Sequence, residues 1–196
     1  MSFIHRLRNF FDKSGGIEPL YTSPEQELAE FRQERAALLQ QRRNAVPDAE
    51  IRLAQQPDTF VVKSAEDKTG KAWVVVMQSS SGNPPSIGRD FRLELIDPEQ
   101  DHDSHPFINA RREQGHIYID ETNALNQKGN EREGRGTLLV RTLQCLASQW
   151  NQGIKGTSTP PAPVTNKDQE DLNAFWKHCG FHVGSAKRSP QIYWTP

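Results

Sequence analysis

The sequence contains little cysteine. Cys145 and Cys179 are its only cysteines among 196 residues, and neither belongs to a Cys-x-x-Cys pair. A disulfide framework and a cysteine-rich zinc or redox motif are therefore excluded. This cysteine usage is typical of a reducing compartment, and we expect a cytoplasmic location.

Long apolar runs and an excess of one charge are also missing. No segment approaches the roughly 18 apolar residues of a membrane span, and residues 1–11 alternate charged and apolar groups, unlike a signal peptide. With 24 basic and 25 acidic residues the net charge is -1, so the positive field of a nucleic-acid-binding protein is absent. We expect no transmembrane segment and no nucleic-acid partner.

Hydrophobic residues make up only 34% of the chain, so part of it is expected to lie outside the core. Residues 1–55 are rich in Gln, Arg and Glu, and they predict a helical N-terminal extension to a domain over residues 56–196. Apolar residues at helical spacing between Phe3 and Phe11 predict a short basic amphipathic helix. This helix either binds a membrane surface or a partner, or folds back on its own domain.

A second helix is predicted over residues 24–44. Ser23 and Gln26 form a capping box around Pro24, which suits a first helical turn. The apolar stripe of this helix is thin and is interrupted by an arginine, so it can cover a sheet or pair with another helix. Its apolar positions are Leu28, Phe31, Leu38 and Leu39. These helices could bind a protein partner or mediate self-association.

From residue 59 the pattern becomes that of strands. Residues 59–63 and 71–78 predict a hairpin with a charged, glycine-bearing turn, and residues 91–96 and 115–120 predict further strands. Strands that follow one another without intervening helices form an antiparallel meander.

The last third of the chain alternates helices with strands. Leucines at i, i+4 and i+7 from Leu139 predict a helix that ends near Trp150, and residues 168–178 predict another. Short strands are expected at 154–158 and within 183–194. The predicted fold is α/β (α+β), with a mixed, mostly antiparallel central sheet and helices on both faces.

A glycine-bearing loop lies between the strand 115–120 and the helix that follows. Glycines allow close approach of a ligand to the backbone, and the first turn of a helix presents unpaired N–H groups to an anion. Arg132 and Arg135 could add charge-assisted hydrogen bonds to phosphate oxygens. The loop is neither a Walker loop nor a dinucleotide-binding Gly-x-Gly-x-x-Gly motif.

Two motifs together resemble the GNAT superfamily of acyl-CoA-dependent N-acyltransferases. They are Gly134-Arg135-Gly136-Thr137-Leu138-Leu139 and, about 40 residues later, Phe175-Trp176-Lys177-His178-Cys179-Gly180-Phe181. The resemblance covers roughly residues 60–194 and is absent before about residue 55.

The resemblance implies a binding site for acetyl-CoA as co-substrate. The pantetheine arm would pair with backbone where two parallel strands separate, at Ile119 and near residues 154–158. The residues that would hold the pyrophosphate are Arg132, Glu133, Gly134, Arg135, Gly136 and Thr137. An amine acceptor, on a small molecule, peptide or protein, would attack the thioester directly.

Two positions depart from the family pattern. Glu131 stands where the family has Arg or Gln, with Arg132 one position away, and Trp176 stands where the family usually has a Tyr that protonates the thiolate. An indole N–H donates a hydrogen bond but is no useful acid near neutral pH.

Candidate bases lie at the end of the strand 115–120. Alternation predicts that Asp120 and Glu121 point to opposite faces, and we favour Glu121, with His116 upstream. Cys179 lacks the His and carboxylate support of a covalent nucleophile. Residues 101–105 carry metal-ligand types at a spacing that is poor for a site, so no metal is expected.

Two functions follow from these observations. The first is an acyl-CoA-dependent N-acetyltransferase that uses a ternary complex. The alternative is a catalytically silent acyl-CoA-binding or protein-interaction module, which Trp176 and the displaced Arg132 favour.

Overall fold

The computed structural model describes residues 23–99, 105–123, 134–159, 165–186 and 189–196. The chain divides into two compact units, Met1–Leu38 and Leu39–Pro196. Residues 39–54 of the predicted N-terminal extension therefore belong to the larger unit. The helix predicted between Phe3 and Phe11 lies outside the described residues.

Helix α2, Pro24–Ala54, begins at the predicted capping box. The Gln26 amide donates to Ser23 Oγ at 3.3 Å, and the Ser23 amide donates to Gln26 Oε1 at 3.1 Å. The predicted end near residue 44 is wrong, because the helix continues through Pro47 to Ala54, nearly three turns further. The apolar contacts of its last turns offset the backbone hydrogen bond that a proline removes.

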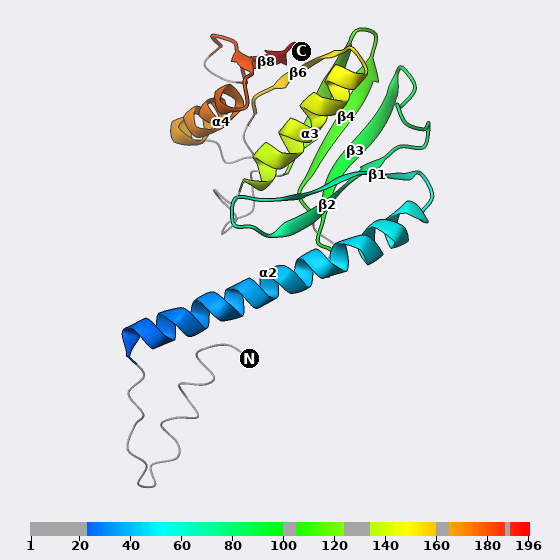
Figure 1. The fold of residues 1–196 in the computed structure, drawn as a ribbon. Helices are drawn as coiled ribbons and strands as arrows, with labels where there is room; N and C mark the ends of the chain where they lie inside the picture. Colours follow the sequence, from blue (N-terminus) through cyan, green and yellow to red (C-terminus); the bar gives the residue numbers. More distant parts are fainter. Residues whose placement is uncertain (1–22, 100–104, 124–133, 160–164, 187–188) are drawn as a thin grey trace, which may run out of the picture. The chain divides into compact units, whose positions relative to one another are not determined.

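The larger unit contains an eight-stranded sheet in the order β1-β2-β3-β4-β5-β6-β8-β7 (Figure 1). Its strands are β1 Thr59–Glu66, β2 Ala72–Gln78, β3 Arg89–Ile96, β4 Phe107–Glu113, β5 His116–Thr122, β6 Gly153–Thr157, β7 His182–Val183 and β8 Gln191–Trp194. All neighbouring pairs are antiparallel except β5 and β6, which are parallel and are connected through α3, Arg135–Gln149. Helix α4, Asn166–His178, follows β6.

Strand β4 was absent from the sequence prediction. Arg111 and Arg112 make this segment polar, yet Ile108 and Ala110 between β3 and β5 are almost fully buried. A strand that buries alternate residues on one face only can carry charges on the other face.

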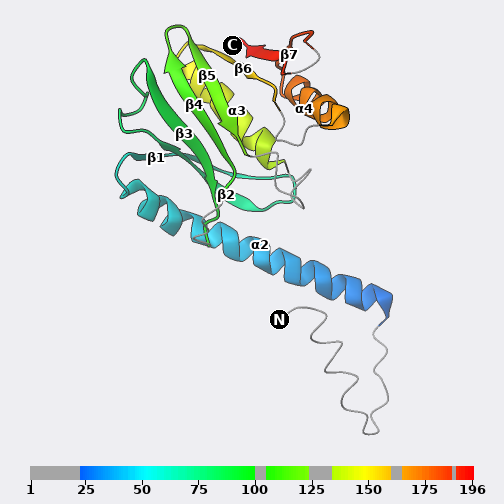
Figure 2. The same ribbon diagram turned by 180° about the vertical axis from the view of Figure 1, so that it is seen from behind.

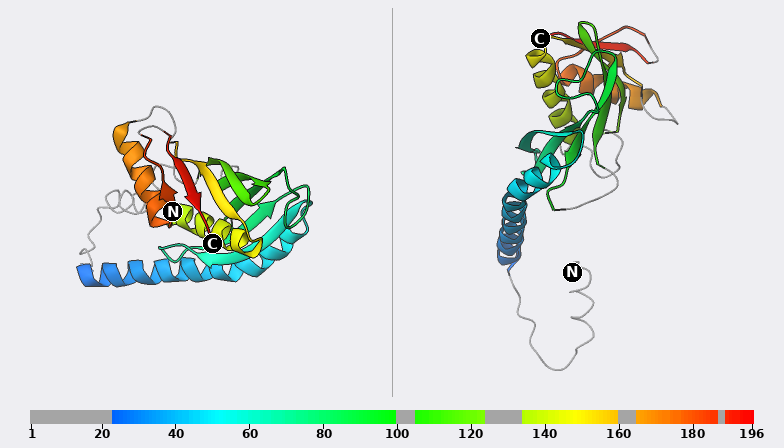
Figure 3. Two further views of the ribbon diagram at one scale, coloured as in Figure 1. Left: turned by 90° about the horizontal axis from the view of Figure 1, so that it is seen from above. Right: turned by 90° about the vertical axis from the view of Figure 1, so that its right-hand side faces the viewer.

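The core lies on both faces of the sheet. In β2, Trp73, Val75 and Met77 join the main cluster with α3, whereas Val74 and Val76 join a smaller cluster with Ala49 and Leu53 of α2. Figure 3 shows α3 along one side of the sheet seen edge-on. The main cluster also contains Trp176, Cys179 and Phe181, so the end of α4 packs on the same face as α3. The predicted mixed, mostly antiparallel sheet with helices on both faces is confirmed.

Candidate functional site

Helix α3 begins at the predicted glycine loop. Gly134 is its N-cap, in a left-handed conformation with φ of 86°, and it has no side chain to accept from the first-turn amides. Gly136 and Thr137 follow within the first turn, which contains no acidic residue. This end of α3 therefore favours an anion, through its amides and the helix dipole. Arg132 and Glu133 lie outside the described residues.

Lys68 reaches this helix start from the turn between β1 and β2. A Cβ on Gly134 would stand only 2.8 Å from Lys68 Cγ, so the lysine side chain lies directly against the glycine. Sequence reasoning missed Lys68, although the charged hairpin turn was predicted. The missing information was that β1 and β2 carry this turn to α3, which is about 65 residues away in the chain.

Arg135 is directed toward the hairpin turn and not outward. Its Nε lies 3.9 Å from Asp67 Oδ2, its guanidinium lies 4.6 Å from the ring centre of Trp73, and its side chain is 11% exposed. The predicted phosphate ligand thus fixes the β1–β2 turn to the start of α3. Among the described residues, Lys68 is the exposed cation at Gly134.

Asp67 organises this turn from a buried position. Its Oδ1 accepts from the Thr69 amide at 2.8 Å and the Thr69 hydroxyl at 2.6 Å, and its Oδ2 accepts from Trp73 Nε1 at 3.0 Å. Burial by itself raises the pKa of Asp67, but the hydrogen bonds from Thr69, Trp73 and the Lys71 amide outweigh it, so the pKa lies below the usual value. The carboxylate stays ionised and attracts Arg135.

Strands β5 and β6 separate close to the predicted position. Their pairing runs from His116 with Gly153 to Ile119 with Gly156. Beyond these residues β5 continues along β4 to Thr122, while Thr157 of β6 pairs with Gln191 of β8. A Cβ on Gly156 would lie 3.1 Å from Ile119 Cβ, so the Ile119 side chain packs against this glycine at the last pair of the ladder. The ladder ends where the resemblance places the pantetheine arm.

A β-bulge follows immediately in β5. Asn109 pairs with Glu121 and Ala110 with Ile119, so Asp120 is an extra residue. The expectation that Asp120 and Glu121 face opposite sides is wrong, because an extra residue interrupts the alternation. Asn109 Nδ2 donates to Glu121 Oε2 at 2.9 Å, and Arg111 Nη2 lies 3.6 Å from Asp120 Oδ1. Asn109 and Arg111 share a face of β4, so both carboxylates lie on that face, opposite α3.

The surroundings of Asp120 shift the pKa of its carboxyl group. Burial raises the pKa of Asp120 above its usual value, and Arg111 opposes this shift. Asp90 and Glu113 raise the pKa further by charge repulsion. Upstream, the predicted alternative base His116 forms a 2.8 Å contact with Glu113.

Trp176 lies in the main core and is 1% exposed. Its ring lies 5.2 Å from Phe175 and 5.0 Å from Phe181, both edge-on. In the part of the chain that the structure describes, its indole Nε1–H has no hydrogen-bond partner. A buried donor without an acceptor costs roughly 1–3 kcal/mol, so an acceptor atom of a ligand would relieve this cost.

The thiol of Cys179 lies beside the first turn of α3, where it contacts the Thr137 hydroxyl. Burial raises the pKa of this thiol to about 11. Such a thiol is not a nucleophile at neutral pH, which agrees with the lack of a supporting His and carboxylate. Both Cys145 and Cys179 are unpaired.

Within the described ranges, no three His, Cys, Asp or Glu side chains gather into a possible metal site. Residues 101–104 of the polar loop lie outside those ranges. None of the described helices has the length and apolar character to cross a membrane.

No protein-family model matches the sequence, and no curated protein matches it. Two solved structures are similar in part. The anti-CRISPR protein AcrVA5 aligns over 46% of this chain and 90% of its own, with 18% identity and a TM-score of 0.37. A Bacteroides thetaiotaomicron protein assigned to the GNAT family of acetyltransferases aligns over 56% of this chain and 64% of its own, with 17% identity and a TM-score of 0.36.

Proposed function

We propose that this protein is an acyl-CoA-dependent N-acyltransferase that transfers acetyl from acetyl-CoA to a primary amine in a ternary complex. The observation that carries the proposal is the separation of the parallel strands β5 and β6 after Ile119 and Gly156, with the intervening helix α3 starting at a glycine cap. This arrangement offers backbone for an extended arm and an anion-binding helix start for a pyrophosphate.

The coenzyme would lie along these backbone groups. Ile119 is the last residue of β5 paired with β6, and beyond it the edge of β5 can pair with the pantetheine amides. Arg132, Glu133, Gly134, Arg135, Gly136 and Thr137 would supply amides to the pyrophosphate. The Arg135 side chain is directed to Asp67 and would not reach the pyrophosphate. Lys68, which lies against Gly134, would supply the positive charge to the pyrophosphate in its place.

The acceptor amine has to be neutral before it attacks, because an ammonium group has no lone pair. We assign the base role to the carboxylates next to the strand separation. Both carboxylates are exposed: Glu121 is held by Asn109, and Asp120 lies next to Arg111. The sequence favours Glu121, and the raised pKa of Asp120 makes it the second candidate.

Trp176 would act by hydrogen bonding. Its Nε1–H is buried and without a partner among the described residues, so it can donate to the sulfur or carbonyl oxygen of a bound thioester. It cannot deliver a proton, and the thiolate would receive its proton from water.

The second candidate function is a catalytically silent module that binds acyl-CoA or a protein. Two observations favour it: Trp176 is not an acid, and the Arg135 side chain is directed to Asp67 and Trp73. The N-terminal helices would then engage a protein partner or a second copy. In α2 the exposed large apolar residues of the smaller unit are Leu28, Phe31 and Leu38.

The test has two stages. Isothermal titration of the full chain with coenzyme A and acetyl-CoA should show binding, and its absence at millimolar ligand would rule out the acyltransferase and an acyl-CoA-binding module. Thioester consumption with a pool of amines, aminoglycosides and peptides should then show turnover. Binding without turnover on any amine would establish the silent module instead. A reducing, cytoplasmic location remains part of the proposal and is consistent with two unpaired cysteines.

A further inference from the structure

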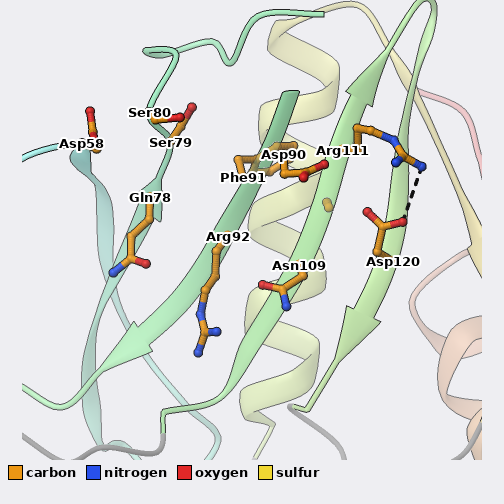
Figure 4. A pocket seen from close by; sticks show the side chains of 11 residues that line it. Asp58, Gln78, Ser79, Ser80, Asp90, Phe91, Arg92, Asn109, Arg111 and Asp120 are labelled. Atoms are coloured by element: carbon orange, nitrogen blue, oxygen red, sulfur yellow. Dashed lines mark ion pairs between the residues drawn. The ribbon is translucent and has the colours of Figure 1, made fainter. Parts of the chain in front are cut away.

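A groove of about 540 Å³ crosses the sheet on the face opposite α3. Figure 2 shows this face, with β3, β4 and β5 in front of α3. The groove extends from the end of β2 at Gln78, across β3 and β4, to Asp120 on β5 (Figure 4). Its size is that of a small-molecule site.

Each arginine of the groove forms an ion pair with a carboxylate outside the lining, and Arg111 is shared with Asp120 of the lining at 3.6 Å. Arg92 Nη2 lies 3.0 Å from Glu94 Oε1, and Arg111 Nε lies 3.2 Å from Glu113 Oε1. Neither Glu94 nor Glu113 lines the groove. The remaining charged residues of the lining are Asp58, Asp90 and Asp120. The lining thus holds three aspartates against two arginines, a net charge of -1, and Glu94 and Glu113 beside these arginines add further negative charge.

The three aspartates are spread along the groove and not gathered at one point. Asp58 and Asp120 lie at opposite ends, with Asp90 between them (Figure 4). Asp90 on β3 lies opposite Arg111 on β4 in the backbone register of the two strands. The Arg111 guanidinium in turn lies 3.6 Å from the Asp120 carboxylate on β5. Asp90 and Asp120 belong to strands two places apart, so their backbones are roughly 10 Å apart. This spacing suits separate cationic groups on one extended ligand.

One end of the groove adjoins the proposed thioester position. Asp120 follows Ile119, the last β5 residue paired with β6, and the bulge directs its side chain to the groove face. A ligand in the groove thus places one end next to the separated strands, with the rest of its length over β4, β3 and the end of β2.

We propose that the groove binds the acceptor, and that the acceptor is a linear polyamine whose terminal amine reacts beside Asp120 while a second ammonium group binds near Asp90 and Asp58. This proposal rests on the acyltransferase function. In the step, the terminal ammonium loses a proton to the base, and the amine nitrogen attacks the thioester carbonyl. A C–N bond forms, the C–S bond breaks, the nitrogen releases its second proton to water, and the departing thiolate takes a proton from water.

The experiment compares spermidine with butylamine, which has one amine and no second charge. With wild type, kcat/KM for spermidine should exceed that for butylamine at least tenfold. Asp90→Asn removes the charge that faces the second ammonium, and KM for spermidine should rise about fivefold to tenfold. Asp48→Asn, on an exposed residue of α2, is the matched control and should leave KM unchanged.

Titration of spermidine onto the protein without coenzyme tests polyamine binding in the groove independently of acyl transfer. Binding that Asp90→Asn weakens, together with no acyl transfer, would support the groove and contradict the acyltransferase. Acyl transfer with equal kcat/KM for spermidine and butylamine would contradict polyamine binding in the groove. The acyltransferase function would still stand. Two further results would overturn this proposal. One is acyl transfer to a lysine-rich peptide but not to spermidine, and the other is no spermidine binding at millimolar concentration.

Discussion

Lys68 lies against Gly134 so closely that a Cβ at position 134 would stand 2.8 Å from Lys68 Cγ. Two segments that are distant in sequence, the β1–β2 turn and the start of α3, thus meet through a lysine side chain and a glycine. Only glycine satisfies both the contact and the φ of 86° at this position.

Gly134→Ala should lower both stability and coenzyme affinity. Left-handed backbone costs an alanine roughly 1–2 kcal/mol, and the new methyl group would also push Lys68 away. Gly115→Ala is the matched control, because Gly115 has a φ of 81° and no described atom within 4 Å of its Cβ position. Urea unfolding and coenzyme A titration measure the two effects. Equal losses in both variants would show that the contact with Lys68 is unimportant.

Lys68→Gln should weaken coenzyme A binding about tenfold, with little change in melting temperature, because Lys68 is exposed and its charge is the feature removed. Raising the salt concentration should reduce the difference between variant and wild type. Lys63→Gln, on β1 of the same hairpin, provides the control. If both variants bind coenzyme A as wild type does, Lys68 is not a phosphate ligand.

Asp67→Asn should destabilise the protein by roughly 2–3 kcal/mol at neutral pH, because the new NH₂ group meets donors such as Trp73 Nε1–H. The pKa of Asp67 is lower in the folded protein than in the unfolded chain, where it is about 3.9. Its contribution to stability is therefore complete above that value and is lost as the pH falls through the folded pKa.

Melting curves between pH 7 and pH 2 test this dependence. The wild type should lose stability at acidic pH faster than Asp67→Asn does, and the two curves should converge. Curves that stay parallel down to pH 2 would contradict the role of the Asp67 carboxylate.

Periodicity and turn chemistry were sufficient to predict the architecture around α3. The leucine spacing from Leu139 and the capping residue Ser23 gave α3 and the start of α2, since both signals are local. The end of α2 was missed because Val74 and Val76, which cover Leu53, belong to a distant strand. Tertiary packing there overrides the local effect of Pro47.

The site was predictable to a smaller extent. A helix after the glycine-bearing loop follows from periodicity, and a separation of the strands near Ile119 is what the family resemblance implies. The sequence does not predict the inward direction of Arg135, the contact of Lys68 with Gly134 or the bulge at Asp120. Each of these features depends on a neighbour that sequence alone cannot place.

Asp120→Asn and Glu121→Gln separate the two candidate bases. Loss of a general base should reduce kcat/KM by about 10² or more. It should also remove the acidic limb of the pH profile, where the rate falls because the base becomes protonated, while coenzyme A affinity stays constant. We expect Glu121→Gln to show this effect, and Asp120→Asn to alter KM for the acceptor more than kcat. The opposite result would assign the base to Asp120, and no effect in either variant would exclude a protein base at this bulge.

Trp176 variants test the role of the indole N–H. Trp176→Phe should lower kcat about tenfold and reduce the melting temperature, because it removes both the donor and part of the core. Trp176→Tyr restores a donor that is also an acid, and should give a higher kcat than Trp176→Phe. Equal kcat in the two variants would limit Trp176 to packing.

The single parallel ladder between β5 and β6 also has a consequence for folding. Strands β1 to β5 pair only with sequence neighbours among themselves, so their contacts close short loops. The β5–β6 ladder needs the whole crossover through α3 and brings distant residues together at a higher entropic cost. The meander is therefore expected to form first during synthesis and refolding, with the proposed coenzyme site completed last, when Gly156 meets Ile119.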